Sequence, residues 1–262
     1  MNVNNIVDNQ MATAMQRIAG GQQINSASDN AAGLAITEGM ESMIRGLNQG
    51  IDNTRDMQNL TNTAEGGLNN IGDGLQRIRE LSIQAANGTN TQADRERIQF
   101  EITEIVDNIS ATARNTQFNN MPLLDGSFQG QNTASAPDGT GVQVNIADMG
   151  DIANTIANMN VSEQTGLDGS FQALDAALAD VSGERAALGA VSNRFDATIE
   201  NNAVAAENLA VAQSQIRDAD IAEEVTDLQQ AQVLNEVQLL MQQQQQEVYE
   251  QEQLAPVMAA AI

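Results

Sequence analysis

The chain has 262 residues and a formal net charge of -24, and it contains no His, no Cys, no Trp and a single Tyr. Without Cys there is no thiol nucleophile, disulfide or thiolate metal site, and without His no side chain has an unperturbed pKa near neutrality. The composition therefore argues against an enzyme and against a metal or other cofactor. All eleven basic residues are Arg and carboxylates outnumber them, which argues against nucleic-acid binding.

Apolar residues in the N-terminal half recur at steps of three and four, the spacing of an amphipathic helix that packs against a partner helix. The runs are Val7, Met11, Ala14, Ile18; Met40, Ile44, Leu47, Ile51, Thr54; Leu68, Ile71, Leu75, Ile78, Ser82, Ala85; and Ile98, Ile102, Ile105, Ile109. A turn is predicted at residues 87–90, with Thr89 or Thr91 as the N-cap of the next helix. The chain would then return antiparallel and pack 91–114 against 66–86.

The middle of the chain is richer in Pro and Gly, and Val142, Val144 and Ile146 alternate with polar residues. This pattern predicts a loop or β-hairpin insert near 119–165. The helical spacing then resumes over Phe171, Leu174, Leu178, Val181, Arg185, Leu188, Ser192, Phe195 and Ile199. The expected fold is mainly α: a long antiparallel helical bundle or coiled coil with a small β-hairpin region.

Residues 221–241 form another amphipathic pattern, which a glutamine run at 242–246 interrupts. The run is either a solvated helical segment or a source of amide hydrogen bonds at a packed interface between subunits, and the sequence leaves both open. No segment approaches the roughly 20 apolar residues of a membrane span, so no membrane insertion is expected. The first ten residues lack the basic and apolar regions of a cleavable signal peptide.

Two segments, AGGQQINSASDNAAGLAI at 19–36 and GAVSNRFDATIENNAVAAENLAVAQSQIRDADIAEE at 189–224, resemble the signatures of bacterial flagellins. Residues 75–90 and 115–128 resemble the same family in matching order. The resemblance implies an inner layer, D0, of terminal helices from 1–33 and 215–262 that pair in a polymer. It also implies a rod layer, D1, from 34–214. Only about 50 residues separate Phe118 from Phe171, so outer domains are expected to be absent.

The function that the resemblance implies is self-assembly into the flagellar filament for swimming motility. The protein would be extracellular, secreted by the flagellar type III export apparatus without a cleavable signal peptide. The implied partners are other copies of the chain, the filament cap and junction proteins, and an export chaperone at the C-terminal helix. Two alternatives are a hook–filament junction protein and a secreted helical protein that does not polymerise.

The resemblance and the spacing together give three sets of candidate site residues. A bend between the layers is expected at Asn25, Asp29 and Asn30, where these residues either cap a helix or act in a conformational switch. A patch on the rod matches family positions that an innate immune receptor recognises, although subunit packing is the first reason for its residues, which are Arg77, Leu81, Gln84 and Glu101. The inner-layer assembly helices are expected to use Val7, Met11, Ile18, Val225, Leu228, Val237 and Leu240.

The chain departs from the family pattern at both ends. The segment before Arg17 is shorter than in the family, and the chain closes on MAAAI at 258–262 in place of a Leu-rich end. We therefore expect the longer C-terminal helix to pair partly with neighbouring subunits. The acidity is either an ordinary solvated surface or an adaptation to saline surroundings, in which screened subunits repel one another less.

Overall fold

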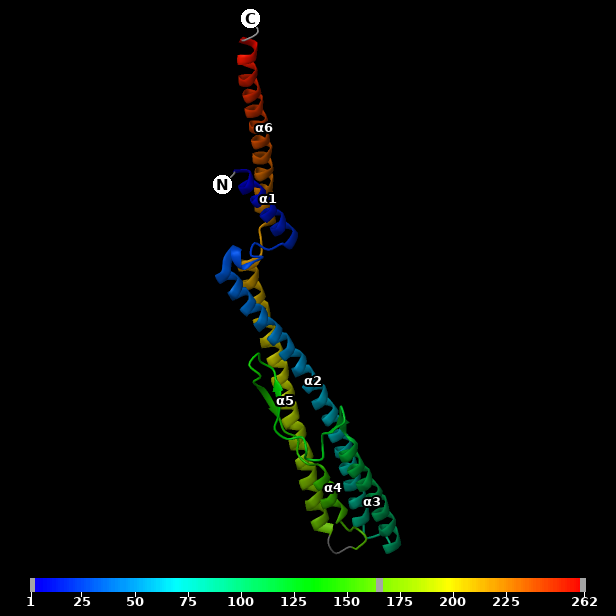
Figure 1. Ribbon diagram of the computed structural model, residues 1–262. Helices are drawn as coiled ribbons and strands as arrows, with labels where there is room; N and C mark the ends of the chain where they lie inside the picture. The colour runs from blue at the N-terminus through cyan, green and yellow to red at the C-terminus, as the bar shows by residue number, and fades with distance from the viewer. Residues whose placement is uncertain (1–2, 164–166, 260–262) are drawn as a thin grey trace. The chain divides into compact units, whose positions relative to one another are not determined.

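The computed structural model describes residues 3–163 and 167–259. In these ranges the chain forms the helices α1 (Val3–Gly20), α2 (Ala27–Ala86), α3 (Gln92–Asn115), α4 (Gly150–Ala157), α5 (Leu167–Arg217) and α6 (Ile221–Ala259). Four short strands are β1 (Gln117–Phe118), β2 (Met121–Pro122), β3 (Gln131–Ala134) and β4 (Gly141–Val144). The predicted mainly α fold with a small hairpin region is confirmed (Figure 1).

The chain divides into two compact units. The terminal unit contains residues 1–42 and 207–262, and the central unit contains residues 43–206. The predicted layer boundaries, 1–33 with 215–262 and 34–214, lie elsewhere, so the assignment of layers stays a prediction.

In the central unit, α2 runs antiparallel to both α3 and α5. Arg77 Nη2 lies 2.9 Å from Glu101 Oε1 on α3, and Ile109, further along α3, packs against the earlier Gly74 of α2. Along α5, Arg79 Nη1 lies 2.9 Å from Asp175 Oδ1, whereas the earlier Gln58 donates to Asp196 Oδ1 at 2.8 Å. The predicted packing of 91–114 against 66–86 is confirmed.

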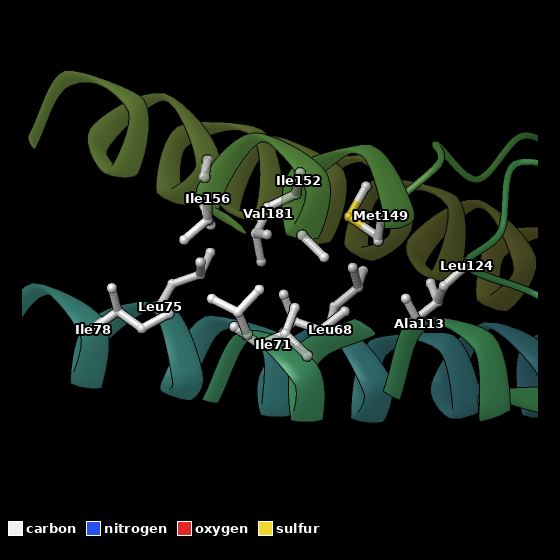
Figure 2. Close-up of a cluster of buried hydrophobic side chains, with 14 of the residues drawn as sticks. Leu68, Ile71, Leu75, Ile78, Ala113, Leu124, Met149, Ile152, Ile156 and Val181 are labelled. Carbon is white, nitrogen blue, oxygen red and sulfur yellow. The ribbon is translucent and has the colours of Figure 1, made fainter. Parts of the chain in front are cut away.

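The core of the central unit lies along this helical packing (Figure 2). Every position of the predicted stripe from Leu68 to Ala85 is buried, and Ser82 satisfies its hydroxyl by donating to Ile78 O at 2.8 Å. On α5, Leu174, Val181, Leu188 and Phe195 are buried, but Arg185, which shares their spacing, is exposed. Each buried aliphatic side chain contributes about 1.5–3 kcal/mol, so the stripes supply the stabilisation that isolated long helices lack.

The turn at 87–90 ends in a capping box. Thr91 is the N-cap of α3: its Oγ1 accepts from the backbone N–H of Asp94, and the carboxylate of Asp94 accepts from Thr91 N at 3.1 Å. The hydrogen bonds from Thr91, side chain first and then backbone, lower the pKa of Asp94. The prediction of an N-cap at Thr89 or Thr91 is confirmed, with Thr91 as the residue.

We expect Thr91→Ala to lower the melting temperature of the central unit by roughly 2–4 °C, because the backbone N–H of Asp94 loses its side-chain acceptor and the Asp94 carboxylate loses the hydroxyl that donates to it. A group with a lowered folded pKa stabilises above its ordinary pKa and stops doing so as the pH falls through the folded value. The difference between the variant and the native chain should therefore shrink on acidification below the ordinary aspartate pKa. Thermal unfolding at several pH values measures this. Thr103→Ala, on an exposed position of the same helix, should cause no comparable loss.

The insert contains more regular structure than the sequence predicted. Asn119 and Asn120 join β1 to β2 with φ values of 48° and 63°, a left-handed conformation that Asn tolerates. Strands β3 and β4 pair antiparallel from Gln131 opposite Val144 to Ala134 opposite Gly141, and Val142, Val144 and Ile146 are buried as their alternation indicated. Helix α4 was not predicted: it buries Ile152, Ala153 and Ile156 against the core.

Candidate assembly surfaces

The terminal unit is built on the pairing of α1 with α6 (Figure 1). Val7 and Ala14 on α1 and Ala231 on α6 are buried. Asn235 Nδ2 donates to Asp8 Oδ1 at 3.1 Å, which fixes the register of the two helices near the start of α1. Because only these few, mostly small, apolar side chains are buried between α1 and α6, the apolar contact between the two helices is narrow.

An ion pair lies near the other end of the same seam. Arg17 Nη1 donates to Glu224 Oε1 at 3.1 Å, and the two side chains are 33% and 11% exposed. The Nε atom of Arg17 is buried without a hydrogen-bond partner among the described residues. A partly buried pair of this kind contributes more to register than to net stability, because desolvation offsets much of the attraction. A groove of about 630 Å³ between the helices includes Arg17 and Glu224 in its lining.

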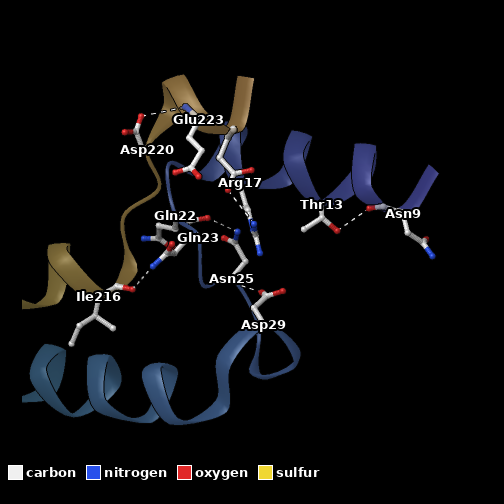
Figure 3. Close-up of polar contacts among 11 residues, drawn as sticks. Asn9, Thr13, Arg17, Gln22, Gln23, Asn25, Asp29, Ile216, Asp220 and Glu223 are labelled. Carbon is white, nitrogen blue, oxygen red and sulfur yellow. Dashed lines mark hydrogen bonds and ion pairs between the residues drawn. The ribbon is translucent and has the colours of Figure 1, made fainter. Parts of the chain in front are cut away.

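Two linkers in the terminal unit form an antiparallel β-bridge, Gln22 opposite Asp218, and Figure 3 shows the side chain of Gln23 reaching Ile216 beside it. Gln23 N donates to Arg217 O at 2.8 Å, and Ala219 N donates to Gly21 O at 3.0 Å. The side-chain Nε2 of Gln23 donates to Ile216 O at 3.0 Å. These bonds satisfy backbone groups that the ends of α1 and α5 leave open.

Asp29 and Asn30 cap the start of α2 after this bridge, whereas Asn25 Nδ2 donates back to Gln22 O at 2.8 Å. Asp29 Oδ2 accepts from Ser26 N at 2.8 Å and from Asn25 N at 3.1 Å, and the hydrogen bonds from Ser26 hold the pKa of Asp29 below its ordinary value. Asn30 has an extended backbone (φ -162°, ψ 95°) inside α2, and its Oδ1 accepts from Gly33 N at 2.9 Å. Helix capping is thus the role that the hydrogen bonds give to Asp29 and Asn30, while a switch at the bend stays untested.

Helix α6 presents an apolar surface that no described residue of the chain covers. We call Val233, Val237, Leu240, Met241 and Val248 the α6 stripe; Val237 is 45% exposed and Leu240 is 64% exposed. With 3.6 residues per turn, the stripe lies on the side of α6 away from Glu224 and Ala231. Exposed apolar side chains that form a continuous patch typically mark a site of interaction with another molecule.

The remaining inner-layer candidates divide between the seam and the surface. Met11, Ile18 and Leu228 are half-buried, and Val225 is 37% exposed. The structure therefore brings Val7, Met11 and Ile18 to the pairing of α1 with α6 and leaves Val225, Val237 and Leu240 exposed. The glutamine run at 242–246 is helical and exposed, which is compatible with both of its interpretations. Of the closing residues 258–262, the last three lie outside the described residues.

The rod patch is only partly a surface. Arg77 bonds to Glu101 at 2.9 Å and to Glu80 at 3.0 Å, and these hydrogen bonds, that of Glu101 first, raise the pKa of Arg77. Gln84 and Glu101 are exposed, but Leu81 is only 2% exposed and belongs to the core. The accessible part of the predicted patch is therefore Arg77, Gln84 and Glu101.

Sequence reasoning missed a contact between the β3–β4 hairpin and two helices, which we call the hairpin contact. Asn53 Nδ2 on α2 donates to Ala134 O at 2.9 Å, and Asn202 Nδ2 on α5 donates to Ser135 O at 2.7 Å. An ideal Cβ on Gly50 would lie 2.1 Å from Ser135 O, and one on Gly46 would lie 2.9 Å from Pro137 Cβ. Gly46 and Gly50 lie one turn apart on α2, and the absence of a Cβ at both lets the hairpin approach the helix backbone closely.

The described residues contain no group of three or more carboxylates placed to hold a metal ion. In the same part of the chain, no helix combines the length and apolarity that a bilayer crossing requires. The surfaces described above are helix faces and a hairpin.

Comparison with known proteins shows which family the chain is similar to. Residues 1–129 match the bacterial flagellin N-terminal helical region, and residues 171–251 match the bacterial flagellin C-terminal helical region. The flagellin of Halalkalibacterium halodurans is 37% identical over 231 residues, covering 87% of this chain and 85% of that one. The flagellar filament 30.7 kDa core protein of Treponema maltophilum is 34% identical over 252 residues, covering 90% and 88%.

Solved structures agree on the fold. The crystal structure of Bacillus cereus flagellin gives a TM-score of 0.50 at 27% identity, over 58% of this chain and 88% of that one. A putative flagellar hook-associated protein from Vibrio parahaemolyticus gives a TM-score of 0.62 at 18% identity, over 72% and 100%, a likeness of fold alone. The chain belongs to the bacterial flagellin family.

Proposed function

We propose that the chain is a structural subunit that assembles with copies of itself into a bacterial flagellar filament used for swimming. The observation that carries the proposal is the α6 stripe, an apolar helix face without a partner in the described chain. A second copy supplies a partner of matching chemistry, because each copy presents the same narrow apolar stripes. Contacts that repeat from copy to copy without closing produce a helical polymer.

The relatives named above are filament proteins and carry no enzymatic name, which supports a structural role over catalysis. The hook–filament junction alternative is not favoured, because its support is a likeness of fold at 18% identity. The filament relatives are 34–37% identical over most of the chain.

Several finer parts of the proposal rest on the family resemblance. The subunit would be extracellular in the flagellum, and the flagellar type III apparatus would export it without a cleavable signal peptide. It would also meet the filament cap and junction proteins, and an export chaperone would bind α6. Residues 1–33 and 215–262 would form D0 and residues 34–214 would form D1. Arg77, Gln84 and Glu101 would serve subunit packing first and receptor recognition second.

The α6 stripe can be tested by placing carboxylates on it. The double variant Val237→Asp with Leu240→Asp should raise the critical concentration for filament formation at least tenfold, because a carboxylate buried without a partner at an interface is costly. Monomer helicity and melting temperature should not change, since both side chains are exposed in the monomer. Negative-stain microscopy and sedimentation measure assembly, and circular dichroism measures the monomer.

Gln232→Asp is the matched control: it adds a carboxylate at an exposed position of α6 beside the stripe, and filaments should form as in the native chain. Filaments of normal length from the double variant would show that the stripe is not an assembly surface. A native chain that forms no filaments at all would overturn the proposed function itself.

A further inference from the structure

Asn87-Gly88 is the one Asn-Gly pair in the sequence, and it lies in the exposed turn between α2 and α3. A backbone nitrogen that follows Asn can attack the side-chain carbonyl carbon, and Gly hinders this attack least because it lacks a side chain. No atom lies within 4 Å of the place where a Cβ of Gly88 would stand. The turn therefore offers the nucleophile room to move.

The hydrogen bonds around Asn87 favour the same reaction. Its Oδ1 accepts from Thr89 N at 3.1 Å and from Thr89 Oγ1 at 3.0 Å. During attack, negative charge develops on this oxygen, and two donors already aimed at it stabilise that charge as an oxyanion hole does. Within the described chain, neither the Gly88 N–H nor Asn87 Nδ2 donates a hydrogen bond, so the nucleophile and the leaving group are both unencumbered.

We propose that Asn87 is a site of spontaneous deamidation and isoaspartate formation that Thr89 promotes. The Gly88 nitrogen forms a bond to Cγ of Asn87, the bond from Cγ to Nδ2 breaks, and ammonia leaves carrying the proton from Gly88. Water then opens the cyclic imide at one of its two carbonyl carbons. Opening at Cγ gives aspartate at position 87, and opening at the backbone carbonyl gives isoaspartate. No oxidant, reductant or enzyme takes part.

The modification changes a structured turn beside the rod patch. Gln84 O accepts from Asn87 N at 3.1 Å and from Asn90 Nδ2 at 2.5 Å, so Gln84 is tied to the reacting segment. Aspartate keeps an acceptor oxygen at position 87 and adds one negative charge. Isoaspartate lengthens the backbone by one carbon, which displaces Thr89 from its two bonds and alters the surface next to Gln84.

The test is to incubate the full folded chain at neutral pH and to follow the fragment of residues 80–95, which an Arg-specific protease releases. Mass spectrometry detects the conversion of amide to acid, and isoaspartyl methyltransferase labels the isoaspartate. Asn90 in the same fragment is an internal control that should stay unmodified. Asn87→Gln should abolish the conversion, and Gly88→Ala should slow it by about an order of magnitude.

Thr89→Val removes one donor and keeps the backbone N–H. In the folded chain it should slow the reaction about fivefold, the effect of losing one net hydrogen bond, whereas in denaturant it should react as fast as the native sequence. The proposal fails if native Asn87 converts no faster when folded than in denaturant. It also fails if Thr89→Val leaves the folded rate unchanged.

Discussion

Replacing Gly50 with Ala is expected to lower the free energy of unfolding of the central unit by about 2–4 kcal/mol. The added Cβ would lie 2.1 Å from Ser135 O and 2.7 Å from its carbonyl carbon. Backbone atoms cannot rotate away as a flexible side chain can, so the β3–β4 hairpin must shift. Such a shift of the hairpin also weakens the hydrogen bonds that Asn53 and Asn202 donate to Ala134 O and Ser135 O.

Chemical denaturation of the native chain and the variant measures this loss. Gly66→Ala is the matched control, because Gly66 lies on the same helix with no atom within 4 Å of an added Cβ. That variant should gain about 0.5–1 kcal/mol, since Ala restricts the unfolded chain and favours helix. Equal stability of the Gly50→Ala chain and the native chain would mean that the hairpin does not rest on α2 in solution.

Filament formation is expected to depend strongly on salt. Each subunit carries a formal charge of -24, and the screening length falls from about 30 Å at 0.01 M salt to about 3 Å at 1 M. Repulsion between subunits should fall accordingly, and we expect the critical concentration for assembly to drop at least tenfold across this range. Sedimentation of filaments at a series of NaCl concentrations measures it.

A variant with four exposed carboxylates neutralised separates charge from other effects of salt. Its formal net charge is -20 in place of -24, so at low salt its critical concentration should be lower than that of the native chain while staying above the native high-salt value; the four changes are Glu104→Gln, Asp107→Asn, Glu200→Gln and Glu207→Gln. A neutral osmolyte at matched osmolality should leave the native critical concentration high. If the native chain assembled equally well from millimolar to molar salt, the acidic surface would be ordinary solvated surface.

Much of the helical core was predictable because the spacing of apolar residues that defines it repeats between residues close together in the sequence. The steps of three and four from Leu68 to Ala85 place one stripe toward neighbouring helices, and every one of those side chains is buried. Leu81 shows where a single stripe is too simple. Because α2 packs against both α3 and α5, its apolar face is wider than one seam, and a residue assigned to a surface patch lies in the core.

Features that depend on distant parts of the chain were not predictable. From the sequence alone, Gly50 is expected only to destabilise a helix. Its contact with Ser135 could not be predicted, because the local pattern does not specify where the hairpin lies. Helix α4 is eight residues long, too short for a periodic signal to stand out. For the assembly surfaces, spacing identified Val237 and Leu240 as apolar positions, but only the structure shows that they lie on the uncovered side of α6.

The hairpin contact also limits where this chain can carry foreign sequence. Exposed turns usually accept grafted peptides, and the turn between β3 and β4 looks suitable because Pro137, Asp138 and Gly139 are exposed. Its base is not free, however: Ser135 N donates to Thr140 O at 3.0 Å, and Ser135 O lies against Gly50 and Asn202. An insertion at this turn is therefore expected to disturb the packing of the hairpin on α2 and α5.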